Sequence, residues 1–181
     1  MNKKINIILA LDEKNGLWKD WDLAWKIKED MQYFKDISVW EWEKQNAVIM
    51  WRKTWNSIPK KYRPLKDRKN IVLSRKKSRE TLQCLSTENQ EIYFSDFNVA
   101  IKKIFQDENI WEIFIIWWAE IYNLALKNKF LDKIYLTRVK WDFSCDVFVD
   151  FKEEEFELIE NSDWKQTKKG IEFRFEVYKR K

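Results

Sequence analysis

Residues 112–127 of this chain read EIFIIWWAEIYNLALK. Residues 112–116 are mostly apolar, and the run is short enough to form a buried strand. The residues from about 119 to 127 are predicted to form a helix directly after it. A strand that leads through a short link into a helix is the unit from which α/β folds with parallel sheets are built.

The same succession of strands and helices extends through most of the chain. Residues 26–37 place Ile27, Met31, Phe34 and Ile37 at helical spacing, which predicts an amphipathic helix with these side chains on its apolar face. Residues 12–22 are polar and turn-like. Strands are also predicted at 5–11, 46–50, 70–74 and 91–94, helices at 53–58, which Pro59 ends, and at 96–106, and antiparallel strands at 132–139 and 171–179.

These elements predict a single domain over residues 1–181, because chains below about 200 residues rarely divide their core. We expect an α/β fold with a mostly parallel central sheet of about eight strands. An antiparallel C-terminal strand and about four flanking helices complete it.

Composition argues against several kinds of protein. The chain has no histidine, so a zinc site or a Ser–His catalytic pair is not expected, and Cys84 and Cys145 fit no metal or redox spacing. It has no run of about 18 apolar residues and no signal-peptide layout, which predicts a cytoplasmic protein. A net charge of +5 allows an anionic ligand, either nucleic acid or a phosphorylated cofactor, although solvated lysines give the same charge.

Tryptophan and glycine occur in abnormal proportions. The chain has 12 Trp and 2 Gly, whereas about 7% of residues are glycine in a typical protein. Tight turns and phosphate-binding loops need glycine, because other residues carry a Cβ and rarely adopt positive φ. The positions of Trp40, Trp42, Trp117 and Trp118 follow neither a helical nor a strand period.

Polar residues follow two of the predicted strands, where ligands bind in parallel sheets. Arg52, Lys53 and Thr54 come after the second strand, and Ser74, Arg75 and Lys76 come after the third. Basic and hydroxyl side chains beside free helix N–H groups suit a phosphate. Either group alone is more often a solvated turn, but two such groups in one sheet favour a phosphorylated nucleotide.

Glu29 and Asp30 lie among the apolar residues of the first predicted helix, and one of them must point nearer its apolar face. A carboxylate in this position is most often a boundary residue. The alternative is a carboxyl group in an apolar cleft, where desolvation raises its pKa and makes it available for proton transfer.

Six blocks resemble dihydrofolate reductases and occur in the order of that family. They are ALDEKNGLWKDWDLAWKIKEDMQYFK (10–35), AVIMWRKTWNSIP (47–59), RKNIVLSR (68–75), IFIIWWAEIY (113–122), IYLTRV (134–139) and DFSCDVFVDF (142–151). Each block alone is modest evidence, but six in order are highly specific.

The resemblance implies reduction of 7,8-dihydrofolate by hydride transfer from NADPH. Asp30 would bind the 2-amino group and N3 of the pterin and promote protonation at N5, and Thr137 would orient Asp30. Arg68 would pair with the substrate's α-carboxylate. The other substrate-binding residues that it implies are Ile8, Ala10, Met31, Phe34, Ile58, Leu65, Ile116 and Tyr122.

The resemblance also implies a cofactor site and a loop, residues 17–25, that closes over the nicotinamide. Trp25 is the tryptophan that the family itself has in this loop. We expect a cytoplasmic monomer without a metal ion, nucleic-acid partner or membrane association. The implied cofactor-binding residues are Ala10, Leu17, Trp18, Trp51, Arg52, Lys53, Thr54, Leu73, Ser74, Arg75, Ile116, Trp117, Trp118, Ala119, Glu120 and Tyr122.

Several tryptophans stand where the family has glycine. Trp18, Trp51, Trp117 and Trp118 replace family glycines, and glycine is plausible at Trp21, Trp40, Trp42, Trp111 and Trp141. Glycine at all nine would leave three tryptophans, Trp25, Trp55 and Trp164, and raise glycine to about 6% of the chain, a usual share. Our hypothesis is that these codons are UGA and that the cell of origin reads UGA as glycine. The alternative is a degenerate, inactive paralogue.

Two other functions remain open at this point. The reductase domain of riboflavin biosynthesis shares the fold, but it is not expected to carry the Leu-x-Trp loop followed by an acid at position 30. A binding module could instead use exposed tryptophan and lysine to stack on single-stranded nucleic acid or sugars. Such a module would not need the set of Asp30, Thr54, Arg68 and Thr137.

Overall fold

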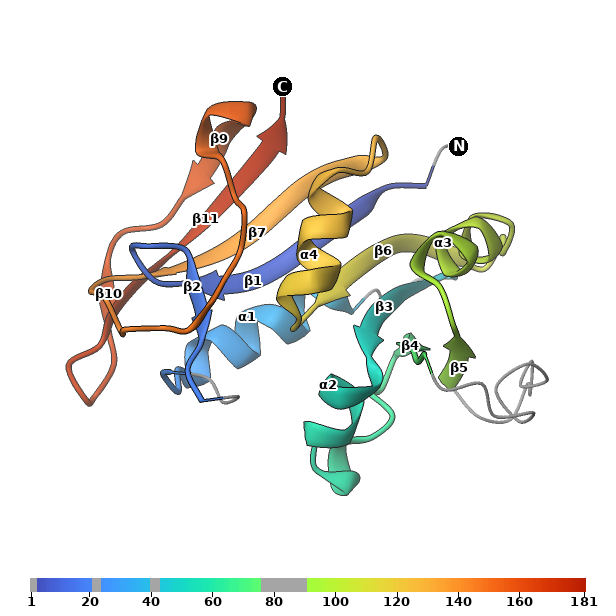
Figure 1. The fold of residues 1–181 in the computed structure, drawn as a ribbon, viewed down its shortest axis with the longest axis horizontal. Helices are drawn as coiled ribbons and strands as arrows, with labels where there is room; N and C mark the ends of the chain where they lie inside the picture. Colours follow the sequence, from blue (N-terminus) through green and yellow to red (C-terminus); the bar gives the residue numbers. More distant parts are fainter. Residues whose placement is uncertain (1–2, 21–23, 40–42, 76–90) are drawn as a thin grey trace.

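The computed structural model describes residues 3–20, 24–39, 43–75 and 91–181. In this part of the chain the main sheet follows the order β10-β11-β7-β1-β6-β3-β4-β5, and β9 pairs with β11 (Figure 1). The strands of the main sheet are β1 (Ile5–Leu11), β3 (Gln45–Trp51), β4 (Arg68–Leu73), β5 (Glu91–Phe94), β6 (Ile110–Ile116), β7 (Leu131–Val139), β9 (Phe156–Asn161), β10 (Lys165–Gln166) and β11 (Glu172–Arg180). The helices are α1 (Lys28–Ser38), α2 (Arg52–Ser57), α3 (Phe97–Phe105) and α4 (Ala119–Leu126), with 3-10 turns at Lys60–Tyr62 and Glu153–Glu155.

The centre of the sheet is parallel and one end is antiparallel. β1 runs parallel to both β6 and β7, β3 runs parallel to β6 and β4, and β4 runs parallel to β5. β11 runs antiparallel to β7, β9 and β10. The predicted single-domain α/β fold, with its antiparallel C-terminal strand and four helices, is confirmed.

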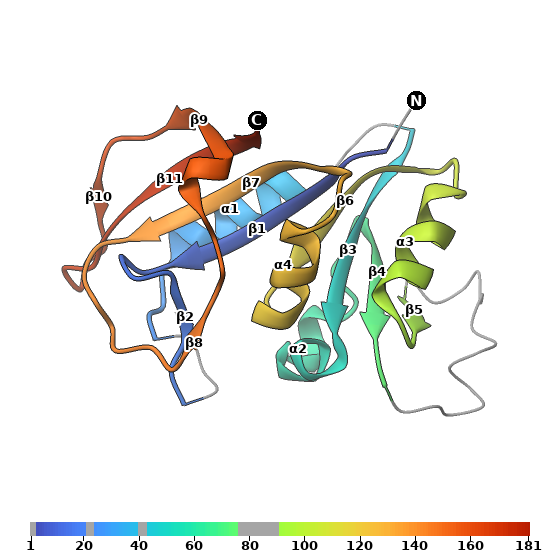
Figure 2. The same cartoon turned by 45° about the horizontal axis from the view of Figure 1, so that its top comes forward.

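Helices cover both faces of the sheet because the side chains of a strand point alternately to its two sides. Ile5, Ile7 and Leu9 of β1 belong to the core cluster that contains the buried residues of α3 and α4. Ile8 belongs to a second cluster, which holds Phe34 of α1 and Trp55 of α2. In Figures 1 and 2, α1 and α4 accordingly lie on opposite sides of β1.

Four short or marginal strands were not predicted. β2 (Gly16–Trp18) lies within the segment expected to be only turn-like, and it pairs with β8 (Val147–Phe148) in a separate two-stranded sheet. In β9 five of the six side chains are exposed. A strand at the margin of a sheet needs no apolar face, so its sequence lacks the alternation that identifies a half-buried strand.

The apolar face of α1 differs from the predicted one. The row of residues 30, 33, 34 and 37 faces the sheet with helical spacing, whereas Met31 is 46% exposed. Ile27 is buried, but it precedes the helix as its N-cap. The prediction that Met31 lies on the buried face was therefore wrong, because Asp30 takes the place in the stripe that an apolar residue was expected to hold.

In the described part of the chain, no helix has both the length and the apolar composition to cross a membrane. Among the same residues no group of three or more acidic or cysteine side chains is arranged to hold a metal ion.

Candidate active site

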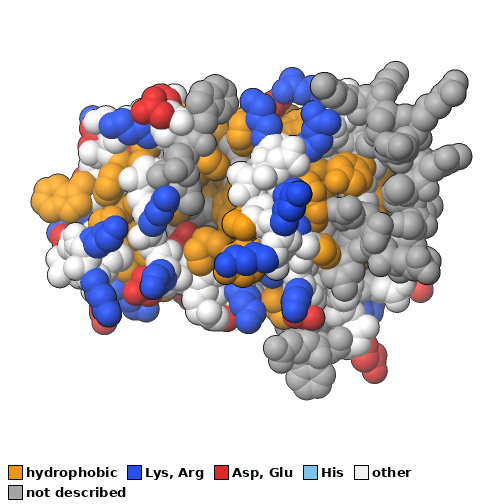
Figure 3. Space-filling view, turned by 90° about the horizontal axis from the view of Figure 1, so that it is seen from below, with side chains coloured by type: hydrophobic (Ala, Val, Ile, Leu, Met, Phe, Trp, Pro, Cys, Tyr) orange, Lys and Arg blue, Asp and Glu red, His pale blue; other side chains and the backbone are white. Residues whose placement is uncertain are grey.

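Three neighbouring parallel strands end at one edge of the sheet, and the segments that follow them meet there. β3 leads into α2, β4 leads into Ser74 and Arg75, and β6 leads through residues 117–118 into α4. Thr54 of α2 donates a 2.8 Å hydrogen bond to the carbonyl of Trp117. Figure 3 looks onto this edge, the lower one in Figure 1, and shows lysine and arginine side chains spread around hydrophobic surface. The residues predicted from several blocks are therefore neighbours in space.

Asp30 and Thr137, the two predicted catalytic residues, are in direct contact. Asp30 lies in the first turn of α1, and Thr137 Oγ1 donates a 2.6 Å hydrogen bond to its Oδ1. Thr137 is paired with Ala10 of β1 on one side and with Phe175 of β11 on the other. Neighbouring strands thus hold the hydroxyl in place. The adjacent carboxylate, Glu29, is exposed.

Burial raises the pKa of the Asp30 carboxyl, because its charged form loses the stabilisation that water provides. The hydrogen bond from Thr137 lowers the pKa, since it stabilises the carboxylate, but this effect is smaller than that of burial. Asp30 therefore keeps its proton to a higher pH than an exposed aspartate. A carboxyl group whose pKa is shifted in this direction is better suited to proton transfer than an exposed aspartate.

Most of the apolar residues predicted for the substrate pocket lie together. Phe34, one helical turn after Asp30 on α1, is buried in a cluster with four other predicted residues: Ile8, Ile58, Leu65 and Ile116. Ala10 lies in a neighbouring cluster with Trp25 and Ile27. The carboxyl of Asp30 therefore borders an apolar region, which accounts for its desolvation.

Arg68 lies at the edge of this cluster. Its guanidinium is centred 5.2 Å from the Phe34 ring, and it donates hydrogen bonds to Ser38 Oγ at 2.7 Å and to the Lys66 carbonyl at 3.0 Å. Burial lowers the pKa of Arg68 to about 10. A partly desolvated guanidinium of known orientation is a suitable partner for a carboxylate.

Sequence reasoning did not single out Ser38. Its hydroxyl accepts the bond from Arg68 and donates one to the Phe34 carbonyl at 2.6 Å, so it ties the arginine to the end of α1. Its partner Arg68 lies 30 residues away in the sequence, and no local pattern reveals a contact over that separation.

The turn between β6 and α4 is held through its backbone. Tyr122 accepts a hydrogen bond from the N–H of Trp117 and donates one to the carbonyl of Ile8 at 2.7 Å. Burial raises the pKa of Tyr122, so its hydroxyl stays protonated. Together with the bond from Thr54, these contacts anchor residue 117 to β1, α2 and α4. Tyr122 therefore acts on the turn from within the core.

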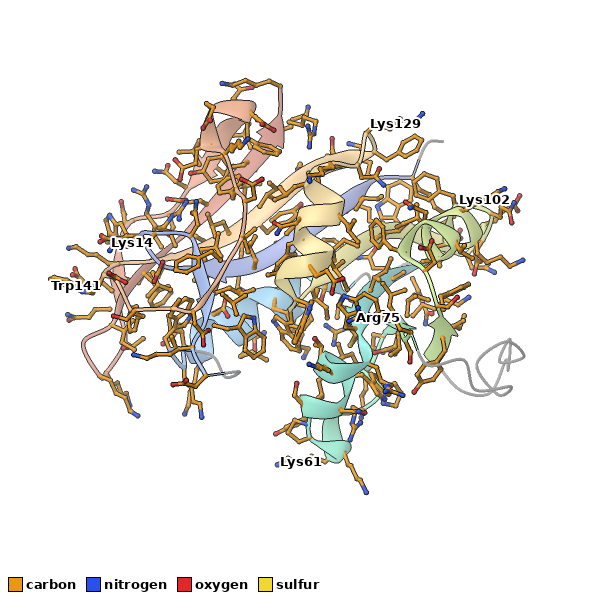
Figure 4. All side chains as sticks on the ribbon, in the orientation of Figure 1. Lys14, Lys61, Arg75, Lys102, Lys129 and Trp141 are labelled. Atoms are coloured by element: carbon orange, nitrogen blue, oxygen red, sulfur yellow. The ribbon has the colours of Figure 1, made fainter. Side chains whose placement is uncertain are left out.

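The basic residues predicted for the cofactor lie beside indole rings. The guanidinium of Arg75, labelled in Figure 4, lies 5.4 Å from the Trp51 ring and 4.0 Å from the carboxylate of Glu120. The ammonium of Lys53 lies 5.3 Å from the Trp118 ring. Among the other predicted residues, Arg52 and Ala119 are half-buried, Leu17, Leu73 and Ser74 are buried, and Lys76 is outside the described residues.

Three tryptophans gather at the predicted cofactor side, and a fourth, Trp117, packs against the apolar cluster predicted for the substrate. The rings of Trp18 and Trp118 are 6.1 Å apart, and the ring of Trp117 is 4.9 Å from that of Phe34. Trp18, Trp51 and Trp118 pack against the core cluster of α3 and α4. All four are half-buried, so their indoles occupy space between the turns.

A separate hollow of about 230 Å³ lies elsewhere, between β4, β5 and α3. None of its lining residues was predicted for substrate or cofactor. They are Lys69, Ile71, Ile92, Phe94, Lys103, Ile104, Gln106, Asp107 and Ile110. The predicted chemistry is therefore not located there.

Comparisons with known proteins agree with the geometry of the site. A family model described as dihydrofolate reductase matches residues 4–180. A putative dihydrofolate reductase of Caenorhabditis elegans is 37% identical over 171 residues, which cover 89% of this chain and 85% of that protein. A dihydrofolate reductase of Heliothis virescens is 35% identical over 98% of this chain and 97% of its own length. One of Rattus norvegicus is 33% identical over the whole of both chains. The match thus extends over the whole fold, and this chain belongs to the dihydrofolate reductase family of oxidoreductases.

Proposed function

We propose that this protein reduces 7,8-dihydrofolate to tetrahydrofolate with NADPH, and that Asp30 promotes protonation of the substrate at N5. The observation that carries the proposal is the Asp30–Thr137 pair, a desolvated carboxyl with a raised pKa that a strand residue orients. A carboxyl whose pKa is raised by desolvation can assist the proton transfer that accompanies reduction of a C=N bond.

The substrate side supports this proposal in two further ways. Ile8, Phe34 and Ile116 form part of an apolar cluster next to the carboxyl, which suits a flat pterin ring. The guanidinium of Arg68, which lies over the Phe34 ring, offers a cation for the substrate's carboxylate. Asp30 would then bind the 2-amino group and N3, while Arg68 binds the opposite end of the substrate.

The cofactor side, in contrast, does not fit NADPH with the residues as they stand. A dinucleotide phosphate needs backbone N–H groups that no side chain covers. Trp117 and Trp118 place two indoles at the turn before α4, and Trp18 and Trp51 fill the space beside it. The NADPH requirement rests on membership of the family.

Titration of the protein with dihydrofolate tests the substrate side without turnover. We expect binding that quenches tryptophan fluorescence and that weakens in Asp30→Asn, while the neighbouring exposed substitution Glu29→Gln leaves it unchanged. Equal binding by the wild type and Asp30→Asn would remove Asp30 from the proposed site.

The same assay separates the other two functions. A nucleic-acid-binding module would bind a single-stranded oligonucleotide more tightly than dihydrofolate, and a reductase of the riboflavin type would prefer a ribosylated pyrimidine. The location in the cytoplasm and the monomeric state stay predictions, which cell fractionation and sedimentation of the protein would test.

A further inference from the structure

Residue 117 is held in a backbone conformation that tryptophan rarely adopts. Its φ is 54°, in the left-handed region, where a Cβ collides with the backbone. The N–H of residue 117 is bound by Tyr122, and its carbonyl is bound by Thr54. Both partners act on backbone atoms, so α2 and α4 impose this conformation whatever side chain residue 117 carries.

Residue 141 shows the same conflict at a distant place. Its φ is 86°, and its indole is 58% exposed. Figure 4 shows Trp141 at the outer end of the molecule, away from the helices around the candidate site. The turn is held on both sides, because the N–H of Lys140 binds the carbonyl of Glu172 at 2.9 Å and the N–H of Phe143 binds the carboxylate of Asp12 at 3.2 Å. Cofactor binding therefore does not explain the conformation at this position.

The chain uses glycine where the structure makes similar demands. Gly170 has φ 84°, almost the value at Trp141. At Gly16 an added Cβ would lie 2.5 Å from Cys145 Cβ, so only glycine fits there. Both glycines of the chain thus stand where a side chain is disfavoured, Gly170 by its backbone angle and Gly16 by lack of space. Positive φ also occurs at Asn15, Asp20, Asp67 and Ser144, which are small polar residues. Positions 117 and 141 share the left-handed backbone of Gly170 but carry the largest side chain.

Three more tryptophans, Trp18, Trp51 and Trp118, lie in or beside the turn that contains residue 117. Trp118 lies against Trp18, and Trp51 lies under Arg75. The indole N–H groups of Trp18 and Trp51 are buried without a hydrogen-bond partner. Trp25 shares this last property, so an unpaired N–H alone does not distinguish the group. What Trp18, Trp51 and Trp118 share is their place at β2, the end of β3 and the start of α4.

We propose that residues 117 and 141, together with 18, 51 and 118, are glycine in the functional polypeptide, because the cell of origin reads their UGA codons as glycine. Trp25 and Trp55, which pack in the core, are tryptophan in the same polypeptide. Trp111 lies inside β6, where the backbone makes no demand for glycine, and the proposal does not include it. Glycine at 117 and 118 would uncover the N–H groups at the start of α4 and remove the misfit with a dinucleotide phosphate.

Peptide masses of the protein purified from the cells that carry its gene test the proposal directly. We expect the peptides that contain residues 117–118 and 141 to have the masses for glycine, and the peptide that contains residue 55 to have the mass for tryptophan. Tryptophan masses at 117 and 141, or UGG codons there, would overturn the proposal. This measurement does not depend on folding or on activity.

A second experiment tests the conformational argument on the chain with tryptophan. Trp141→Gly should raise the Tm by about 2–4 °C, because it relieves a left-handed conformation. Trp141→Ala removes the indole but keeps the Cβ and should give a smaller rise. Trp164→Gly is the matched control: Trp164 is also exposed and also near Lys140, but its φ is not positive, so its replacement should not raise the Tm. Equal Tm values for the glycine and alanine variants at 141 would refute the argument from backbone conformation.

Discussion

The α1 side of the site differs from the turns at the ends of β3 and β6 in the kind of residue it contains. The α1 side is made of hydrogen-bonded polar residues, whereas the turns carry bulky indoles. On the α1 side, Asp30 is bound by Thr137, and Arg68 is positioned by Ser38. At the turns, indoles from positions 18, 51, 117 and 118 lie where the resemblance implies glycine, one of them at positive φ. The first region keeps the polar pairs proposed for the substrate, whereas indoles fill the second, and that of Trp117 also packs on Phe34.

This difference bears on whether the tryptophans reflect decoding or decay. A decaying paralogue would lose residues of many types from both regions. Here even the turn region keeps its polar groups, since Thr54 and Tyr122 still hold residue 117 and Arg75 still lies beside the turn. The misfit is confined to one residue type, which favours a difference in decoding over loss of function.

The largest expected effect belongs to Asp30. In the chain with glycine at 18, 51, 117 and 118, Asp30→Asn should slow dihydrofolate reduction about 10²–10⁴-fold near neutral pH, the usual effect of removing a positioned proton-transfer group. The defect should shrink at lower pH, because the solvent then supplies the proton. Steady-state rates as a function of pH measure this, and Glu29→Gln is the control. Unchanged turnover at pH 7 would show that Asp30 has no catalytic role.

Removal of the indoles should have the next largest effect. With glycine at 18, 51, 117 and 118, the affinity for NADPH should rise at least about 100-fold over that of the protein with tryptophan. The indoles fill a close-packed region that does not repack around a ligand. Glycine at 117 and 118 alone should recover part of this affinity. Calorimetry on the three proteins measures the series. Equal affinities throughout would mean that the tryptophans do not block the site.

Arg68 should affect the substrate and not the cofactor. Arg68→Ala should raise the KM for dihydrofolate about 10–100-fold, the range expected when a charge-assisted hydrogen bond is lost. Arg68→Lys should recover only part of the loss, since lysine keeps the charge but not the planar pair of donors. Lys66→Ala, an exposed neighbour, is the control. A matching loss of NADPH affinity would place Arg68 elsewhere in the mechanism.

Arg75 should have a smaller effect, which depends on the cofactor. Because its side chain is 78% exposed, its removal should weaken NADPH only about fivefold, the range of exposed ion pairs. Arg75→Ala and Arg52→Ala should weaken NADPH more than NADH, since both are assigned to the side of the 2′-phosphate. Binding of both cofactors to each variant gives the ratio, and equal losses for the two cofactors would contradict the assignment.

The smallest expected effect concerns stability. Because the folded-state pKa of Asp30 is raised, the contribution of this group to stability is complete at acidic pH and is lost as the pH rises through that pKa. Asp30→Asn cannot ionise and should gain stability relative to the wild type from about pH 4 to about pH 7. Thermal unfolding at the two pH values measures the difference. Parallel Tm curves would mean that the carboxyl is not desolvated.

Much of the architecture could be predicted from the sequence because local patterns determine it. The apolar run of β6 and its link to α4 identify a buried strand followed by a helix, and the same reasoning located β1, β3 and β4. Candidate residues at the ends of these strands followed from the general position of ligand sites in parallel sheets. β9 escaped prediction because an exposed strand needs no apolar face.

Only the tertiary structure decided which of these residues act together. The sequence contains Glu29 and Asp30 side by side, but the docking of α1 on the sheet leaves Asp30 half-buried and Glu29 exposed. The bond between Asp30 and Thr137 joins residues 107 positions apart, and no local pattern encodes such a contact. The composition revealed an excess of tryptophan, whereas the backbone angles showed that residues 117 and 141 are tryptophans in the left-handed region that favours glycine. Residue types and short-range periodicity are local properties, but burial and backbone strain arise only when the elements pack together.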